Sequence, residues 1–307
     1  MSGRPPLDQV LLGDVRELSR ELPAASAQCI VTSPPYYGHR AYSAAGDPRE
    51  LGREKAPQDY VDALVGCLGE AGRLLREDGT LWLNLGDTYR RGRLLGIPWR
   101  VALALQDAGW HLRADIVWHK PNAMPSSVRT RPTTDHEYLF LLSRSASYYY
   151  DADAIREPHV TFTERSRMRG GRGHLGKRAG TPERGKNQGD GNLHDARWDE
   201  YFHPAGRNRR TVWSVPLGKF REAHFAVFPE ALIEPCIKAG CPPGGVVLDP
   251  FMGSGTTAVV CHRLGRHFLG FELIPEYVEL ARRRLAAARE TGYSATIRQF
   301  PGQEKHP

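Results

Sequence analysis

A short glycine turn between a predicted strand and a predicted helix most constrains how this chain can fold. Residues 246–248 (VVL) predict a buried strand, and the segment DPFMGSGTT at residues 249–257 leads into a helix predicted over 256–264. Gly253 and Gly255 allow the backbone to turn tightly and to approach a ligand closely. Glu272 ends the next predicted strand, 272 − 255 = 17 residues after Gly255, where an acid can accept hydrogen bonds from ribose hydroxyls. The segment therefore predicts a site for a nucleoside cofactor.

The position of this turn in the chain limits the kind of nucleoside. The two glycines and Ala258 satisfy the dinucleotide pattern G-x-G-x-x-A, so an NAD-dependent dehydrogenase is one hypothesis. A dinucleotide domain needs several further strand–helix units after the turn, but only 307 − 255 = 52 residues follow Gly255. The rest of the sheet must come from earlier in the chain, which disfavours the dehydrogenase. A P-loop is excluded, because no G-K-[ST] triplet occurs.

Alternating strands and helices predict an α/β fold with a mainly parallel sheet. Strands are predicted at residues 8–14, 27–31, 80–85, 114–119, 138–142, 148–151, 246–248 and 267–272, and helices at 15–22, 57–76, 98–108, 228–239, 256–264 and 275–288. Residues 8–13 are expected to form the strand that follows the last helix in the sheet. That pairing would bring Asp14 close to Glu272.

A second rigid element follows the predicted strand at 27–31. Residues 32–36 read TSPPY, and two consecutive prolines fix the backbone and remove two N–H donors. The carbonyls around Pro34 and Pro35 are therefore expected to face the site as fixed acceptors, with the flat ring of Tyr36 available to stack on a base. A pocket rich in acceptors and poor in donors suits an exocyclic amino group.

Positive charge is concentrated in one part of the chain. The net charge of the 307 residues is 42 − 35 = +7, and residues 159–210 alone contribute 12 − 6 = +6. The stretch has few large apolar side chains, so it predicts a solvated loop that orders on a phosphate backbone. Five separated cysteines disfavour disulfides and zinc sites. With no apolar run of about 18 residues and no signal peptide, a cytoplasmic protein is expected.

These motifs resemble those of the S-adenosylmethionine-dependent DNA amino-methyltransferases. Residues 32–36 resemble the family's catalytic motif, and residues 249–256 resemble its cofactor motif. The catalytic motif precedes a target-recognition region and the cofactor motif follows it, an order that resembles the β class. The resemblance covers residues 8–155 and 211–290. It implies a circularly permuted Rossmann-like methyltransferase sheet with an inserted basic target-recognition region. The implied domains are the catalytic half at 1–155, the insert at 156–212 and the cofactor-binding half at 213–307.

The resemblance also implies roles for individual residues. The flipped target base would be held by Ser33, Pro34, Pro35 and Tyr36. The cofactor would be bound by Asp14, Thr32, Phe225, Phe228, Asp249, Phe251, Gly253, Ser254, Gly255, Thr256, Thr257 and Glu272. Within that set, Glu272 would hold the ribose, Asp249 would lie near the methionine amino group, and Asp14 would contact the adenine amino group. The DNA would be contacted by Arg165, Arg167, Arg169, Arg172, Lys177, Arg178, Arg207, Arg209 and Arg210.

For three further positions the sequence favours a structural role or leaves the role open. Asp87 is either a site residue or a turn and helix cap. His119 and Lys120 are expected at a solvated strand end. Residues 148–150, three tyrosines, are expected to pack within a strand rather than stack on a base.

The implied reaction is direct transfer of a methyl group from S-adenosylmethionine to cytosine N4 in double-stranded DNA. Ser33 favours cytosine, since relatives that act on adenine N6 more often carry an acid or Asn there, but adenine N6 stays an alternative. Two other hypotheses are an enzyme that methylates RNA or a protein glutamine and a nucleic-acid-binding protein that has lost catalysis. The first of these is the closer alternative to a DNA methyltransferase. The sequence implies neither a bound metal nor a membrane association. The resemblance allows a cognate restriction endonuclease as a partner and a homodimer as the oligomeric state.

Overall fold

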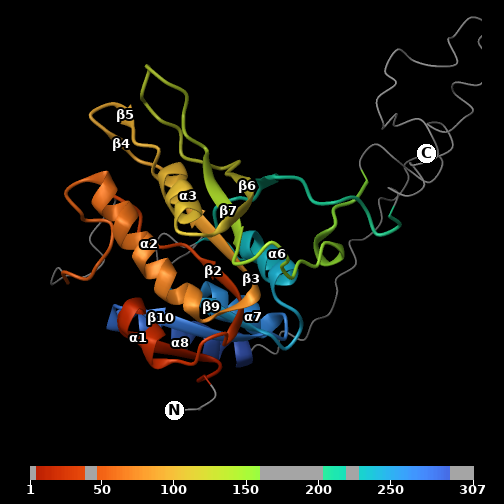
Figure 1. Cartoon of the computed structure of the whole chain (residues 1–307). Coiled ribbons are helices and arrows are strands. Elements are labelled where there is room, and N and C mark those ends of the chain that lie inside the picture. The colour runs from red at the N-terminus through yellow and green to blue at the C-terminus, as the bar shows by residue number, and fades with distance from the viewer. Residues whose placement is uncertain (1–4, 39–46, 160–202, 219–227, 291–307) are drawn as a thin grey trace, which may run out of the picture. The chain divides into compact units, whose positions relative to one another are not determined.

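The largest element of the fold is a twisted sheet of eight strands (Figure 1). The computed structural model describes residues 5–38, 47–159, 203–218 and 228–290. The chain divides into a larger unit of residues 1–151 and 211–307, which holds this sheet, and a smaller unit of residues 152–210. The strands are β1 (Gln9–Leu12), β2 (Ala27–Thr32), β3 (Leu75–Leu85), β6 (His111–His119), β7 (His136–Ser143), β8 (Val212–Ser214), β9 (Val246–Asp249) and β10 (His267–Glu272), with β4 (Tyr89–Arg90) and β5 (Arg93–Leu94) forming a separate hairpin.

The sheet is mainly parallel, as the alternation of elements predicts. Its strand order is β1-β10-β9-β2-β3-β7-β6-β8. Strands β1, β10, β9, β2 and β3 pair in parallel, and only β7 runs antiparallel to its neighbours β3 and β6. The carboxyl ends of the five parallel strands therefore meet at one edge of the sheet, where open α/β sheets bind their ligands.

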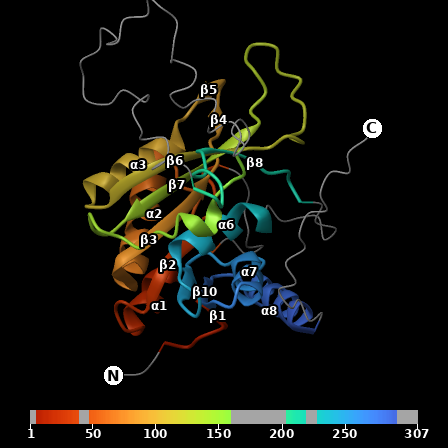
Figure 2. The same ribbon diagram turned by 90° about the vertical axis from the view of Figure 1, so that its right-hand side faces the viewer.

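Helices cover both faces of the sheet (Figure 2). They are α1 (Val15–Glu21), α2 (Pro57–Arg73), α3 (Ile97–Asp107), α6 (Glu230–Gly240), α7 (Thr256–Arg263) and α8 (Pro275–Glu290). Helices α1, α2 and α3 share one hydrophobic core with Ile30, Leu81 and Leu83 of the central strands, whereas α6, α7 and α8 lie along the opposite face. Both faces of the central strands are thus buried, which explains their unbroken apolar runs.

Helix α2 illustrates how the sequence specifies one of these elements. Pro57 occupies its first turn, where the missing N–H costs nothing, and Asp59 accepts a hydrogen bond from the Ala56 N–H at 3.3 Å. Its apolar stripe includes Tyr60, Leu64 and Leu68, each fully buried. Each such leucine contributes about 1.5–3 kcal/mol when buried. The helix ends at Arg73 rather than Arg76, because β3 starts at Leu75, five residues before the predicted strand.

The two ends of the chain meet in the sheet as predicted. Strand β1 pairs in parallel with β10, with Leu12 opposite Glu272, and the Gly13 N–H donates to the Glu272 carbonyl at 2.9 Å. Asp14 follows directly and lies near Glu272, because both residues line the same cavity. That this strand order is a circular permutation stays an inference from the family resemblance.

The prediction of a strand at residues 148–151 is wrong. This segment is irregular, and its backbone donates from Tyr149 to the Asp78 carbonyl and from Asp151 to the Ala239 carbonyl. Consecutive tyrosines favour a strand by propensity, but this segment makes only isolated backbone hydrogen bonds of this kind and forms no ladder within the described residues. The expected packing role is confirmed, since the ring of Tyr150 stacks on that of Trp82 with centroids 6.3 Å apart.

Other differences are smaller. Helix α6 starts at Glu230 rather than Phe228, and β8 and the β4–β5 hairpin were not predicted. All five cysteines are free and buried. Within the described residues, no helix is long and apolar enough to cross a bilayer.

Gly240, the last residue of α6, packs closely against strands β2 and β3. A Cβ placed there would lie 2.6 Å from Trp82 Nε1, 2.7 Å from Thr80 Oγ1 and 2.8 Å from Cys29 Sγ. The neighbours are fully buried, so they have little room to move.

We expect Gly240→Ala to lower the free energy of unfolding by about 1–3 kcal/mol, because an added methyl overpacks a filled core. Gly69→Ala is the matched control: Gly69 lies exposed in α2 with no atom within 4 Å of the new Cβ, and alanine there should stabilise by about 0.4–1 kcal/mol. Urea denaturation of both variants measures this. Equal effects of the two substitutions would contradict the packing described.

Candidate active site

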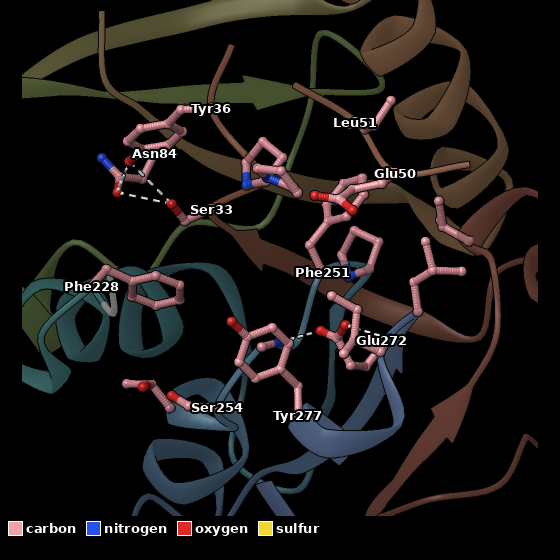
Figure 3. A pocket seen from close by; sticks show the side chains of 18 of the residues that line it. Ser33, Tyr36, Glu50, Leu51, Asn84, Phe228, Phe251, Ser254, Glu272 and Tyr277 are labelled. Carbon is pink, nitrogen blue, oxygen red and sulfur yellow. Dashed lines mark hydrogen bonds between the residues drawn. The ribbon is translucent and has the colours of Figure 1, made fainter. Parts of the chain in front are cut away.

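A cavity of about 640 Å³ opens at the carboxyl ends of the parallel strands. It lies within the larger unit, and Figure 3 shows its lining. Ser33, Tyr36 and Asn84 group together on one side, and Ser254, Glu272 and Tyr277 on the other, with Phe228 and Phe251 also facing the space. The cavity is lined by the predicted residues Asp14, Ser33, Pro34, Pro35, Tyr36, Phe228, Phe251, Gly253, Ser254, Thr256 and Glu272.

The glycine turn after β9 has the backbone geometry that its sequence suggests. Gly253 and Gly255 have φ angles of 53° and 84°, in the left-handed region that favours glycine. A Cβ on Gly255 would also lie 2.8 Å from the Ala281 Cβ of α8. The turn therefore needs glycine at 255 for its conformation and for packing.

The carboxylate of Glu272 lies at this turn and lines the cavity. It is 8% exposed and accepts from the Gly253 N–H at 2.8 Å through Oε2 and from the Ile274 N–H at 2.9 Å through Oε1. Burial raises the pKa of Glu272 from its ordinary 4.5 to about 7, although the two backbone hydrogen bonds oppose that shift. Each oxygen can accept more than one hydrogen bond, so the group retains acceptor capacity for a ligand.

Asp249 does not form part of the described cavity wall. It is fully buried and accepts from Thr32 Oγ1 at 2.7 Å, from Thr257 Oγ1 at 2.6 Å and from the Phe251 N–H at 3.1 Å. Burial raises the pKa of Asp249 to about 6. Asp249, Thr32, Thr257 and Gly255 thus support the turn and strand ends, and none of them is among the described residues that line the cavity.

Asp14 lines the cavity but its carboxylate is already engaged. Oδ1 accepts from the Arg16 N–H and Nε, both at 2.8 Å, and Oδ2 accepts from Arg16 Nη2 at 2.6 Å. Burial opposes its charge, but the hydrogen bonds from Arg16 outweigh burial, and the pKa of Asp14 lies below its usual value. It caps the N-terminus of α1 and would contact a ligand only through remaining lone pairs.

The proline motif positions Tyr36 through its backbone neighbours. The Pro35 carbonyl accepts from the Tyr60 hydroxyl at 2.8 Å, so this carbonyl is not the open acceptor that the sequence suggests. A Cβ on Gly86 would lie 2.7 Å from the Tyr36 ring, so glycine there lets the ring settle against β3. The motif is therefore anchored by α2 and by the end of β3.

Ser33 and Tyr36 join a polar network that sequence reasoning missed. The Tyr36 hydroxyl oxygen lies 3.1 Å from Ser33 Oγ, 3.0 Å from Asn84 Oδ1 and 2.8 Å from Glu137 Oε2. Ser33 Oγ lies 3.3 Å from Asn84 Oδ1, and Asn84 Nδ2 donates to Glu137 Oε2 at 3.2 Å. Burial, and then the Glu137 carboxylate, raise the pKa of Tyr36 well above its usual value. Tyr36 is therefore a neutral donor.

The expectation for Lys120 is wrong. Its side chain is only 16% exposed, lines the cavity and forms an ion pair with Glu137. His119 is 40% exposed and contacts Ser214 Oγ, as expected for a strand end. The alternative for Asp87 is resolved as a cap, because its carboxylate accepts from the N–H groups of Gly96 and Ile97 at the start of α3.

The cavity residues that were not predicted differ in how clearly the sequence marks them. Asn84 is an amide inside the apolar strand LWLNL, which is unusual for a buried strand. Glu137 and Lys120 stand near strand ends, where charged residues are common. Two further lining residues, Tyr277 and Arg284, lie in the predicted helix over 275–288 with no motif to single them out.

Several predicted residues cannot be placed in the cavity. Phe225 and Arg165, Arg167, Arg169, Arg172, Lys177 and Arg178 lie outside the described residues. Arg207, Arg209 and Arg210 belong to the smaller unit. There Arg207 and Arg210 pair with Glu157 at 2.9 Å and 2.7 Å.

Comparison with known proteins connects this site to a family. Residues 27–283 match the N6_N4_Mtase family, described as DNA methylase. The chain is 42% identical to the Type II methyltransferase M.Cfr9I of Citrobacter freundii over 302 residues, covering 89% of this chain and 86% of that protein. It is 39% identical to the Type II methyltransferase M.SmaI of Serratia marcescens over 310 residues, covering 92% and 91%.

Solved structures agree with this match. TTHA0409 of Thermus thermophilus, in complex with S-adenosyl-L-methionine, is 27% identical with a TM-score of 0.58, covering 91% of this chain and 93% of that one. The PvuII DNA methyltransferase, described as cytosine-N4-specific, has a TM-score of 0.63 at 20% identity, covering 92% and 90%, and this likeness concerns the fold alone. The family match spans most of the chain and includes both motifs, although β1 and the cavity-lining residues 13–15 precede it. This chain therefore belongs to the N6/N4 DNA methylase family and is a DNA methyltransferase of the Type II kind.

Proposed function

We propose that this chain transfers a methyl group from S-adenosylmethionine to N4 of cytosine in double-stranded DNA. The observation that carries the proposal is the joining, in one cavity, of the Glu272 side and the Ser33–Tyr36–Asn84 side. One side offers acceptors for a nucleoside and the other offers acceptors for an amino group. The order of the two motifs along the chain supports the β class of these enzymes.

The Glu272 side fits the cofactor. Its carboxylate has acceptor capacity for the two ribose hydroxyls, and the backbone at Gly253 leaves open space where a side chain would stand. Phe251, Phe228 and Tyr277 provide apolar surface around it. When bound, S-adenosylmethionine supplies an electrophilic methyl group. The chain's own contribution is to hold the nucleoside in place and to exclude water from the space between the two sides.

The Ser33 side fits an exocyclic amino group. Ser33 Oγ and the carbonyl of Pro34 are acceptors for its hydrogens, and accepting them favours the pyramidal, nucleophilic nitrogen. Alignment of base and methyl donor then provides much of the rate enhancement. The reaction needs no cysteine nucleophile: Cys67 lines the cavity, but burial raises its pKa to about 12, which keeps it a thiol.

Ser33 is the observation that favours cytosine over adenine. A serine hydroxyl is short and neutral, and it can both accept from an amino group and donate to a ring nitrogen. Adenine N6 is the second candidate, because the family includes enzymes for both atoms.

Double-stranded DNA is supported by the family and by charge. The exposed Arg90, Arg91 and Arg93 lie on the β4–β5 hairpin, which follows the carboxyl end of β3 and so extends from the edge that carries the cavity. The insert at 156–212 adds the largest share of positive charge, and we propose it as the target-recognition region between catalytic residues 1–155 and cofactor-binding residues 213–307. A cytoplasmic location rests on the sequence features given above, and a cognate restriction endonuclease and a homodimer rest on the resemblance alone.

The first prediction here concerns the pH dependence of cofactor binding. The ribose hydroxyls must donate to an ionised carboxylate, and the pKa of Glu272 is about 7 in the free protein. The affinity for S-adenosylmethionine should therefore fall as the pH drops through 7, approaching tenfold per pH unit well below the pKa. Calorimetry between pH 5.5 and 8.5 measures it.

Glu272→Gln is the matched control for this prediction. This variant should bind S-adenosylmethionine roughly 10–100-fold more weakly at pH 8, because a charge-assisted hydrogen bond is removed. Its affinity should also lose the part of the pH dependence that arises from ionisation of Glu272. An identical pH slope in both proteins would remove Glu272 from the binding site.

The second prediction concerns the target atom. Sequencing DNA from cells that express the chain locates the methylated site, and mass spectrometry of its nucleosides should yield N4-methylcytosine. N6-methyladenine as the sole product would reject the assignment of Ser33 to cytosine.

On the same duplex, Ser33→Ala and Tyr36→Phe should each lower kcat by roughly 10–100-fold, since each removes a hydrogen bond to a charged or reacting group. Tyr37→Phe is the control, because the Tyr37 hydroxyl makes two 3.4 Å contacts, with the Lys55 carbonyl and with Arg90 Nη1, and Tyr37 lines no described part of the cavity. Cofactor affinity should stay unchanged in all three variants.

The third prediction concerns the DNA backbone. The residues to neutralise are Arg165, Arg167, Arg169, Arg172, Lys177 and Arg178. For each DNA phosphate that then has no cation beside it, the slope of log K against log salt should fall by about 0.9. Arg20→Gln and Arg76→Gln are controls, since both residues lie at the ends of their elements that are remote from the cavity edge. An unchanged slope in the insert variants would make the insert a linker only.

A further inference from the structure

The ion pair between Lys120 and Glu137 lies inside the candidate base pocket. Lys120 follows β6, and Glu137 lies on β7 opposite Trp118. Their side chains are 16% and 15% exposed, and both line the cavity. Lys120 Nζ also lies 4.5 Å from the centroid of the Trp118 ring, and its backbone N–H donates to the Asp135 carbonyl at 2.7 Å. Both the ammonium group, through Glu137 and Trp118, and the backbone of Lys120 are therefore held in place.

Stability alone is a poor explanation for this pair. Removing two charges from water costs several kcal/mol per ion, and well-packed apolar residues often serve a fold as well or better. An ion pair that lines a ligand cavity is positioned to contact the ligand that binds there. The question is which group of the substrate an ammonium at this position would meet.

The network arranges its polar groups in a fixed order along one wall. Ser33 Oγ lies at one end, 3.1 Å from the Tyr36 hydroxyl, and that hydroxyl lies 2.8 Å from Glu137 Oε2. Asn84 Nδ2 donates to the same Oε2 at 3.2 Å, and Lys120 bonds to the other oxygen, Oε1. The wall therefore runs from a hydroxyl, through an amide and a carboxylate, to an ammonium group.

We propose that Lys120 donates a hydrogen bond to the 2-oxo group of the target pyrimidine. The Watson–Crick edge of cytosine carries an amino group, a ring nitrogen and then the 2-oxo acceptor, and the last of these has no counterpart in adenine, which carries C2–H. With the amino group at Ser33, the acceptor meets the ammonium end of the wall. An ammonium has three donors, so one can serve Glu137 and another the base.

In this arrangement Glu137 is a positioning residue. Its Oε1 holds Lys120 and its Oε2 holds Tyr36 and Asn84, so one carboxylate sets the distance between the two ends of the wall. The inference rests on the proposed function, and it adds the means by which the pocket distinguishes a pyrimidine from a purine.

A combined protein and substrate substitution tests it. Lys120→Met keeps the apolar stem and removes the charge. The substrates are the duplex with cytosine at its methylated site and the same duplex with a 2-aminopyridine C-nucleoside there, which keeps the amino group and ring nitrogen and lacks the 2-oxo group. Affinity is measured with S-adenosylhomocysteine bound, so that the readout needs no chemistry, and kcat/KM is measured on the cytosine duplex.

On cytosine, Lys120→Met should lower kcat/KM and affinity by roughly 10–100-fold, as for a hydrogen bond to a charged group. On the 2-aminopyridine duplex, wild type and Lys120→Met should bind equally within about threefold. Glu137→Gln should show the same dependence on the 2-oxo group, which a merely structural role would not. The control is Lys238→Met, since Lys238 forms a similar pair with Glu234 at 2.6 Å on α6 and lines no described part of the cavity.

Two results would overturn the inference. If Lys120→Met weakens binding equally on both duplexes while its affinity for S-adenosylmethionine and its Tm match wild type, Lys120 acts on the pocket and not on the 2-oxo group. If Lys120→Met retains full activity on cytosine, the ion pair has no part in base recognition. Neither result affects the proposed function, which fails separately if the wild-type protein makes no N4-methylcytosine.

Discussion

The hydrogen bond from Thr32 to the buried carboxylate of Asp249 joins two segments 217 residues apart. Thr32 ends β2 just before the proline motif, and Asp249 ends β9 just before the glycine turn. The same carboxylate also accepts from Thr257 and from the Phe251 N–H, so it fixes the start of α7 and the turn together. Removing one such donor from a buried acceptor costs about 1–3 kcal/mol. Together with the pairing of β2 with β9, this carboxylate fixes the relative position of the two sides of the cavity.

Much of the fold could be predicted because it follows from local patterns. The apolar strands, Pro57 at the start of α2 and the glycines at 253 and 255 each reflect a constraint that acts within a few residues. The pairing of β1 with β10 was also predictable, because too few residues follow Gly255 to complete a sheet. The three tyrosines at 148–150 were misleading, since propensity favours a strand but tertiary context decides whether one forms.

The candidate site was predictable on the side of its contiguous motifs and not elsewhere. Ser33, Tyr36, Gly253 and Glu272 stand in short segments whose chemistry can be recognised from spacing. Asn84 and Glu137 lie on two other strands and Lys120 follows a third, so the three meet only in the folded sheet and no spacing along the chain signals them. For Asp249 the motif identifies the residue clearly. Only the structure, however, shows that its carboxylate is hydrogen-bonded to other protein groups and does not face the cavity.

Two of the carboxylates that line the cavity, Glu137 and Glu272, differ in how their charge is satisfied. Glu137 faces an ammonium, a phenol and an amide, so its charge is balanced before any substrate arrives. Glu272 accepts from the backbone N–H groups of Gly253 and Ile274, and burial still raises its pKa to about 7. A ligand that donates two hydroxyl hydrogens would restore its ionised form, and each pKa unit regained corresponds to about 1.4 kcal/mol of binding free energy. The polar groups that would contact the base are thus already hydrogen-bonded to one another in the free protein. The Glu272 carboxylate, in contrast, has too few hydrogen-bond donors around it, and the ribose hydroxyls of a bound nucleoside would supply them.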